Sequence, residues 1–367
     1  MINYSLSARR VATGAAYGAS PKDEYAREAV QKALAKMRPC TVGSVLLFLS
    51  NAYAHAPQNA IKEAAKAAGT PLVFGCCAIG LLTEDECLID IDGAVAMVFP
   101  QELSLQPLRV LRPQGIVPEQ VFTLASPNAM NIAINASSCP QFGAISSDEY
   151  GQGPYSVWQS GRIVEQEYTQ LAFATQLRST LLTSEGIQRL SAVMQVNKVD
   201  GNYLLEVGEQ PALDNIQKHL QTGSCFDVMC AVSETNNPDS IAQGHYELVH
   251  VLAVDDIKKT VTLANEIKAG KQIFWARRCA NNAIKSMQSE LKVAQEALNK
   301  EPEFALMFPN VSRGTEFFNG HDQDLENFKL AFPGTPLIGF YSNAEIVPGF
   351  KSPAIIKHHS TVAALFA

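Results

Sequence analysis

The chain has 367 residues, of which 47% are hydrophobic and 18% are charged, and its 29 Lys and Arg against 36 Asp and Glu give a formal net charge of −7. This length and composition exclude a disordered, collagen-like or coiled-coil protein and predict a globular protein of about two to three domains. The negative net charge repels phosphates and anionic membrane surfaces, so we do not expect nucleic acid as a partner.

Membrane segments and metal motifs are not apparent in the sequence. The longest apolar runs, such as 45–49 and 93–99, have the length of strands and fall well short of the roughly 20 residues that span a bilayer. The first ten residues lack the apolar segment of a secretory signal. The eight cysteines include no C-x-x-C motif and no histidine at zinc-ligand spacing. We therefore expect a cytoplasmic protein with no membrane contact and no structural zinc site.

One stretch of the sequence occurs twice. Gly-Thr-Pro-Leu-Val at 69–73 recurs as Gly-Thr-Pro-Leu-Ile at 334–338. In both places an apolar run and a helix-like segment precede it, and a glycine-containing turn and an apolar closing strand follow it, at 95–99 and 362–366. The apolar residues form a continuous run, then recur at helical spacing, and then form a continuous run again. This predicts a unit of strand, helix, strand, turn and return strand.

A third copy of this unit is fainter. It runs from an apolar segment at 121–126 through a short helix at 128–135 to strands at 141–146 and around 171–173. Units of this kind build layered α/β domains. We therefore predict an α/β protein with mixed sheets flanked by helices.

The region between the second and last copies has a different character. Asp200-Gly201 separates two segments in which apolar and polar residues alternate, as in β-strands. This dipeptide favours the tight turn of a β-hairpin. A helix is predicted at 211–221, where Pro211 stands in the first turn, and the spacing of apolar residues predicts a long helix at 282–299.

The apolar pattern breaks between the two halves of the chain. Thr183, Ser184 and Gly186 interrupt it at 182–188. We therefore predict two domains, one at 1–185 and one at 186–367.

Seven segments, taken in their order and spacing, resemble a known family: 45–50, 75–80, 143–148, 200–213, 312–314, 339–345 and 358–361. With them, nearly the whole chain resembles the FIST family ("F-box and intracellular signal transduction"), with its N-terminal and C-terminal domains in order. Two positions depart from the family pattern. Val311 stands where a cysteine is frequent, and Ala344 stands where a glycine usually precedes the glutamate.

The resemblance implies a cytoplasmic sensory domain that binds a small ligand, such as an amino acid or a related metabolite. Because the two domains account for almost every residue, we expect it to act on a separate signalling partner. Some members of the family resemble haem proteins that sense nitric oxide and regulate a histidine kinase, which is the alternative function.

Glycine turns after buried strands bring backbone N–H groups and small side chains to strand ends, where α/β sheets often form ligand crevices. Arg313 and Glu345 follow two strands of the last copy, so they would clamp the carboxylate and the ammonium group of a zwitterion. The alternative is an Arg–Glu pair that joins two loops. Our candidate ligand-binding residues, expected to line the largest pocket, are Gly75, Cys76, Cys77, Arg313, Tyr341, Ser342, Asn343 and Glu345.

Cys76 and Cys77 are adjacent, so a strand would send their side chains to opposite faces, one into a pocket and one into the core. Free cysteines mostly pack as small apolar residues, and a nucleophilic thiolate needs a base beside it. No such base is evident in the sequence. An enzyme that uses Cys76 or Cys77 is therefore the last alternative.

An axial ligand is the first requirement of a haem site. The imidazole candidates are His245, His250, His358 and His359. His358 matches the terminal motif of the family, so it is our axial candidate. Cys139-Pro140 is typical of some regulatory haem sites, but here we interpret it as the start of a strand.

Overall fold

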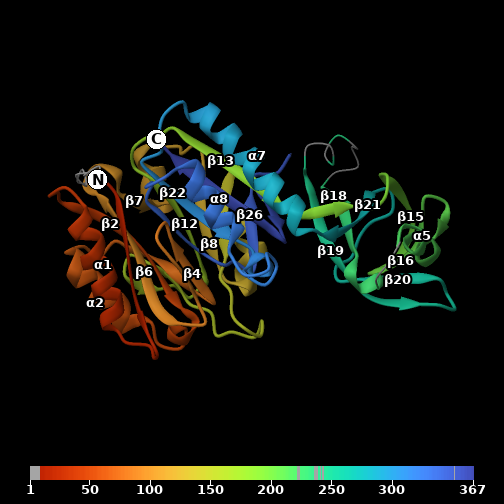
Figure 1. Ribbon diagram of the computed structural model, residues 1–367, viewed down its shortest axis with the longest axis horizontal. Helices are drawn as coiled ribbons and strands as arrows, with labels where there is room; N and C mark the ends of the chain where they lie inside the picture. Colours follow the sequence, from red (N-terminus) through yellow and green to blue (C-terminus); the bar gives the residue numbers. More distant parts are fainter. Residues whose placement is uncertain (1–8, 221–223, 235–238, 240, 242–243, 351) are drawn as a thin grey trace.

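The computed structural model describes residues 9–220, 224–234, 239, 241, 244–350 and 352–367. Two lobes are visible in Figure 1. The large body contains residues 9–185 and 280–367, and the small lobe, green to cyan on the right, contains residues 187–278. The chain leaves the large body after Glu185 and returns at Ala280, so the small lobe is an insertion. The spatial lobes thus differ from a simple division at 185/186, because the last quarter of the chain pairs with sheets of the large body.

The large body is built from three copies of one unit. The first copy consists of β1 (Ala12–Gly18), α1 (Glu24–Lys36), β2 (Val42–Ser50), η1 (Asn51–Tyr53), α2 (Gln58–Ala68), β3 (Val73–Ala78), β4 (Gly80–Thr83), β5 (Cys87–Ile89) and β6 (Asp92–Pro100). Strands β2 and β3 are parallel, and β6 lies antiparallel between β1 and β2.

The second copy follows η2 (Gln101–Leu103) and has the same order of elements. It consists of β7 (Leu105–Pro107), α3 (Leu108–Leu111), η3 (Arg112–Gln114), β8 (Val121–Ala125), η4 (Pro127–Ala129), α4 (Met130–Asn135), β9 (Gln141–Ile145), β10 (Val157–Gln159), β11 (Arg162–Ile163) and β12 (Tyr168–Phe173). The third consists of β13 (Ser179–Glu185), α7 (Ala280–Leu298), β22 (Phe304–Pro309), η6 (Val311–Arg313), α8 (Gln323–Ala331), β23 (Leu337–Phe340), β24 (Ala344–Val347), β25 (Ile355–Lys357) and β26 (Ser360–Phe366).

All three predicted copies are confirmed. The repeated Gly-Thr-Pro motif leads into the second parallel strand, β3 in the first copy and β23 in the third. The closing strands β6 and β26 are buried along almost their whole length. The fainter copy is real as well, because β8 and β9 are parallel and β12 returns antiparallel to β8.

The units interlock by exchanging hairpins. The three six-stranded sheets have the orders β1-β6-β2-β3-β10-β11, β7-β12-β8-β9-β24-β25 and β13-β26-β22-β23-β4-β5. The β4–β5 hairpin of the first unit therefore extends the sheet of the third unit. The β24–β25 hairpin of the third unit extends the sheet of the second, and the β10–β11 hairpin of the second unit extends the sheet of the first. This exchange joins the three units into one body.

The three sheets share a phenylalanine-rich core, and helices cover their outer faces. Phe48, Phe122 and Phe308 come from the equivalent strands β2, β8 and β22 and meet in this core, with the rings of Phe122 and Phe308 5.6 Å apart. Helices α1 and α2 pack on the first sheet, α4 on the second, and α7 and α8 on the third. The predicted layered α/β class is thus confirmed, and strands covered on both faces explain the continuous apolar runs.

The small lobe is a closed antiparallel sheet. Its elements are β14 (Ile187–Arg189), β15 (Met194–Asp200), β16 (Tyr203–Val207), β17 (Gln210–Pro211), α5 (Ala212–His219), η5 (Cys225–Asp227), β18 (Met229–Ser233), β19 (Tyr246–Asp255), β20 (Thr260–Leu263) and β21 (Gln272–Arg278). β21 pairs with both β15 and β18, which closes the ring around its own apolar core. The predicted hairpin around Gly201 and the helix after Pro211 are both present.

Candidate functional site

The ends of β3, β9 and β23 converge at Ser147. Its hydroxyl accepts a hydrogen bond from the amide of Ile79 at 3.2 Å and donates one to the carbonyl of Tyr341 at 2.5 Å. Ile79 belongs to the glycine turn of the first unit, and Tyr341 belongs to that of the third. The two predicted turns therefore do meet, and a residue of the second unit joins them.

A cavity of about 360 Å³ opens beside this point, and we call it the strand-end cavity. Gly80 and Tyr341 contribute one wall. The other lining residues that matter for its chemistry are Asp90, Arg278, Ser312 and Glu316. A guanidinium and two carboxylates thus face a space of the size that small-ligand sites commonly have.

Arg278 is the last residue of β21, where the chain returns from the small lobe. Its guanidinium donates to the carbonyl of Ser312 and lies 4.7 Å from the ring centroid of Phe317. Burial, and then the neighbouring Arg313, lower the pKa of Arg278. An arginine held in this way has spare donors for a bidentate contact with an anion.

Behind Ser312 lies a chain of two imidazoles. The Ser312 hydroxyl is 2.6 Å from Nδ1 of His359, and Nε2 of His359 is 3.0 Å from Nε2 of His250. Burial, followed by the nearby His250 and Arg278, lowers the pKa of His359 to about 3, so its ring is neutral near pH 7. His359 also has a positive φ of 58°, which a non-glycine residue seldom adopts. The chain therefore holds Ser312 in a fixed orientation at the cavity wall.

Arg313 faces away from the strand-end cavity. It is fully buried, and its Nε and Nη2 donate to the two carboxylate oxygens of Asp324 at 2.8 and 2.7 Å. Nη2 also contacts the Ser184 hydroxyl at 3.1 Å. Asp324 at the start of α8 occupies the guanidinium, so the alternative Arg313–Glu345 pair is not formed, and contact of Arg313 with a ligand carboxylate stays a prediction.

Glu345 is likewise buried in the protein's own hydrogen bonds. Its carboxylate accepts from the hydroxyls of Ser342 and Ser360 at 2.6 and 2.5 Å and from the amide group of Asn310 at 2.9 Å. Burial is the dominant influence and raises the pKa of Glu345 to about 7. Glu345 does not line the strand-end cavity, and its predicted contact with a ligand ammonium group stays a prediction.

Gly75, Cys76 and Cys77 lie within β3, inside the protein. Cys76 packs into the shared core and Cys77 packs under helices α1 and α2, so the predicted opposite orientation is confirmed. Neither thiol lines the strand-end cavity, and the expectation that one of them contacts a ligand stays a prediction. Burial raises both thiol pKa values, which disfavours the nucleophilic thiolate.

Two family models match the chain, the FIST N domain over residues 44–210 and the FIST C domain over residues 212–348. The chain belongs to the FIST family. FIST domains are sensory domains of signal transduction. A search of curated proteins finds no match.

Of the remaining predicted site residues of this FIST protein, Tyr341 alone lines the strand-end cavity, and its hydroxyl donates to Asp322. Ser342 is buried against Glu345, and Asn343 is exposed. Sequence reasoning missed Arg278, Asp90 and the orienting role of His359. Arg278 is far from both glycine turns in sequence, so only the fold brings it to them, whereas Asp90 directly follows the exchanged hairpin of the first unit.

A larger cavity, of about 710 Å³, lies between the two lobes of this FIST protein, so the prediction that the candidate residues line the largest pocket is wrong. His358 lines this inter-lobe cavity, as do Lys268 and Lys271. Burial lowers the pKa of His358, whose ring hydrogen-bonds the backbone of Asn343. A ring held through one nitrogen keeps the other for a metal, which fits an axial ligand.

No helix among the described residues is long and apolar enough to cross a membrane. In the same part of the chain, no three His, Cys, Asp or Glu side chains gather in a way that would hold a metal ion.

Proposed function

We propose that this protein is a cytoplasmic sensor that binds a small carboxylate-bearing metabolite, of the size of an amino acid, in the strand-end cavity. The observation that carries the proposal is the placement of Arg278 beside Asp90 and Glu316 around about 360 Å³ of space. The guanidinium would take the carboxylate, and either acidic side chain would take an ammonium group.

The position of Arg278 suggests how binding is reported. It ends the last strand of the small lobe, whereas Gly80 and Tyr341 belong to the large body. A ligand that contacts both would tie the small lobe to the large one and favour one arrangement of the two. We propose that a separate signalling protein, with a histidine kinase as the first candidate, reads this arrangement.

A thermal-shift screen over amino acids and related metabolites tests the binding. A ligand at 100 times its Kd stabilises the folded state by about 2.7 kcal/mol. Arg278→Met should weaken that ligand about tenfold or more, because a charged hydrogen bond contributes about 1.5–3 kcal/mol. Arg277→Met is the matched control, since the Arg277 side chain contacts Gln188 and does not line the cavity. A panel without a stabiliser, or equal losses in both variants, would overturn the proposal.

The second candidate function is haem binding, which the placement of His358 favours. His358 would hold the iron in the inter-lobe cavity, with Lys268 and Lys271 near the acidic groups of the macrocycle. A bound haem iron would supply a site for nitric oxide. Reconstitution should then give a Soret band that His358→Ala abolishes and that the exposed His321→Ala retains. The absence of the band, or its persistence in His358→Ala, excludes this function.

A further inference from the structure

Ser312 stands at the wall of the strand-end cavity, in the turn η6 just after strand β22. Its side chain is partly buried, and its hydroxyl lies 2.6 Å from Nδ1 of His359. A serine hydroxyl is a weak nucleophile until a neighbouring base removes its proton. Because His359 is within hydrogen-bonding reach, the pair has the geometry of a nucleophile and its base.

His359 is in turn held by a second histidine. Its Nε2 lies 3.0 Å from Nε2 of His250, which belongs to β19 of the small lobe. When the Ser312 hydroxyl donates to Nδ1, the neutral ring of His359 carries its hydrogen on Nε2 and donates it to His250. A nucleophile, a base and a group that orients the base are the three parts of a catalytic triad.

The ring of His359 is in the protonation state that a base needs. Burial, followed by the nearby His250 and Arg278, keeps its pKa far below 7, so the ring is neutral. A carbonyl oxygen that gains negative charge beside Arg278 offsets that cation, which raises the pKa of the ring as it takes the proton. His359 also has the positive φ of 58°, and residues in such sparsely populated conformations cluster at active sites.

Arg278 lies where a developing negative charge needs hydrogen-bond donors. It lines the same cavity, and its guanidinium donates to the carbonyl of Ser312, the residue that carries the nucleophile. Stacking on the ring of Phe317 holds it there. Donors fixed beside a carbonyl oxygen stabilise the oxyanion that forms when a nucleophile attacks. The guanidinium can therefore serve as the oxyanion partner.

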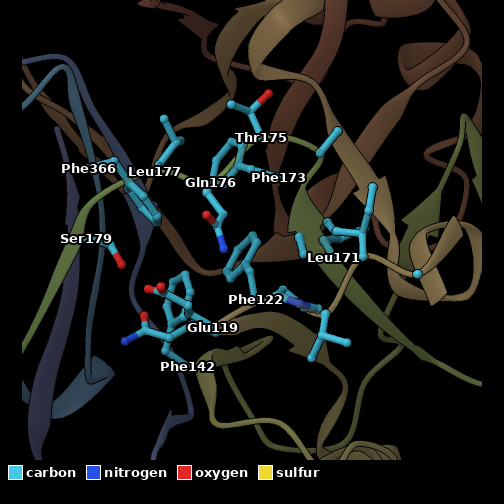
Figure 2. Close-up of a pocket in the computed structure, with 17 residues that line it drawn as sticks. Glu119, Phe122, Phe142, Leu171, Phe173, Thr175, Gln176, Leu177, Ser179 and Phe366 are labelled. Carbon is cyan, nitrogen blue, oxygen red and sulfur yellow. The ribbon is translucent and has the colours of Figure 1, made fainter.

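A second serine at a cavity wall shows what distinguishes Ser312. Ser179 lines a separate groove of about 440 Å³, which Phe122 and Phe142 also line (Figure 2). Ser179 is partly buried, like Ser312. None of the described residues that line this groove is a histidine. A place at a cavity wall thus does not by itself activate a serine, and Ser179 provides a matched control.

We propose that the chain hydrolyses small carboxylic esters in the strand-end cavity, with Ser312 as the nucleophile, His359 as the base and His250 as the positioning residue for His359. Oγ of Ser312 attacks the ester carbonyl and passes its proton to Nδ1 of His359. The bond between the carbonyl carbon and the alcohol oxygen breaks, and the alcohol leaves with that proton. Water then attacks the acyl group on Ser312 and gives a proton to His359. The bond to Oγ breaks, Oγ takes this proton back, and the carboxylic acid is released.

Asp90 and Glu316 narrow the class of ester. Both line the cavity, and their carboxylates attract an ammonium group on the substrate. We therefore expect amino-acid esters with a free amino group to be preferred over the N-acetylated esters. Both side chains are exposed, so the preference should be roughly two- to fivefold. This activity requires the cavity but no signalling role, and so goes beyond the proposed sensor.

Alanine ethyl ester is the probe, and its hydrolysis by the full chain is followed as the release of acid. N-acetylalanine ethyl ester should react more slowly. Ser312→Ala and His359→Gln should each lower turnover at least about 100-fold, the range of general base catalysis. Ser179→Ala should leave turnover unchanged. No hydrolysis by the wild type, or equal turnover in Ser312→Ala and wild type, would overturn the proposal.

A covalent label tests the nucleophile without any variant. Phenylmethanesulfonyl fluoride should sulfonylate Oγ of Ser312 in the wild-type chain, with release of hydrogen fluoride. Mass spectrometry of peptides locates the modified residue. Labelling of Ser179 to the same extent as Ser312, or no label on Ser312, contradicts the assignment of the nucleophile.

Two variants of His250 test its positioning role. His250→Leu removes the acceptor for the Nε2 hydrogen of His359 and should lower turnover at least tenfold. His250→Gln retains an acceptor and should keep most of the turnover. Equal losses in the two variants would show that His250 only fills space.

The thermal-shift screen separates this activity from the proposed sensor. If an amino acid stabilises the chain but no ester is hydrolysed, the sensor stands and the hydrolase is wrong. If esters are hydrolysed and no metabolite stabilises the chain, the hydrolase stands and the sensor is wrong.

Discussion

The first and third units of the large body share one architecture but differ at the ends of their strands. In both, two parallel strands are followed by an exchanged hairpin and a buried closing strand. In the short helix after its first parallel strand the first unit has Tyr53, whereas the third has Arg313, which is fully buried together with Asp324 of α8 and Glu345 of β24. Because the first unit folds with Tyr53 at the position of Arg313, these charges are not a requirement of the scaffold. They mark where the repeated unit has been specialised.

The location of these charges suggests what the specialisation does. Arg313 donates to the hydroxyl and carbonyl of Ser184, one residue before the chain leaves for the small lobe. Asp324 also accepts from Thr361 at 2.7 Å, at the start of the closing strand. The buried pair therefore fixes the root of the insertion to two elements of the third unit. Arg278, at the other root, forms the wall of the strand-end cavity.

The largest effect that we predict is the loss of this buried pair. Arg313→Met leaves the Asp324 carboxylate buried without its main partner, which should lower the free energy of unfolding by about 3–5 kcal/mol. Urea denaturation measures this. Arg27→Met, in the partly exposed pair with Glu63 of the first unit, should change stability little.

A double variant separates the pair from simple packing. Arg313→Met with Asp324→Leu removes both charges, so it should recover much of the stability lost in Arg313→Met alone. If the double variant is no more stable than the single one, the cost arises from lost packing, and the contrast between the two units is one of shape and not of charge.

The sequence was sufficient to predict the repeated unit, but it was not sufficient to predict how the three units assemble. The recurring Gly-Thr-Pro motif and the apolar closing runs predicted the copies because each unit is specified by local patterns of residues. The exchange of hairpins depends on which sheet edges meet in three dimensions, and no pattern within β4 and β5 or β24 and β25 indicates it. For the same reason, Arg313 could be paired in sequence with Glu345 as readily as with Asp324, and Arg278 could not be placed at all.

The second prediction concerns a glycine that occupies an equivalent position in each of the three units, where we expect replacement by alanine to destabilise the fold. A side-chain Cβ at these positions would lie 1.6–1.9 Å from a backbone oxygen of the neighbouring parallel strand. The glycines are Gly75 facing Leu47, Gly143 facing Thr123 and Gly339 facing Met307. Each Gly→Ala substitution should therefore lower the free energy of unfolding by about 3 kcal/mol, at the upper end of the usual cost of overpacking, since backbone cannot rotate away.

Gly314→Ala is the control for these substitutions. The nearest atom to a Cβ there is 3.9 Å away, and φ is −70°, so alanine fits. Thermal or urea unfolding of the four variants compares the units directly. Should Gly339→Ala alone be tolerated, the third unit packs its strands differently from the other two.

The smallest predicted effect is a pH dependence carried by Glu345. Burial raises the pKa of this carboxyl from 4.5 to about 7, so the folded state keeps a proton that the unfolded chain has already lost. The stabilisation is fully present below pH 4.5 and is lost as the pH rises through 7. Between about pH 5 and pH 8 it should lower the free energy of unfolding by about 2 kcal/mol.

Glu345→Gln removes the titrating group, so the difference in stability between wild type and variant should shift in favour of the variant as the pH rises. The subtraction cancels other groups such as His359, whose pKa of about 3 acts in the opposite direction, since its contribution is lost as the pH falls below 6.5. Urea denaturation at a series of pH values gives both curves. If they run parallel, Glu345 is ionised in the folded state throughout. The hydrogen bonds from Ser342, Ser360 and Asn310 would then outweigh burial, and the third unit would hold a permanent negative charge where the first unit has none.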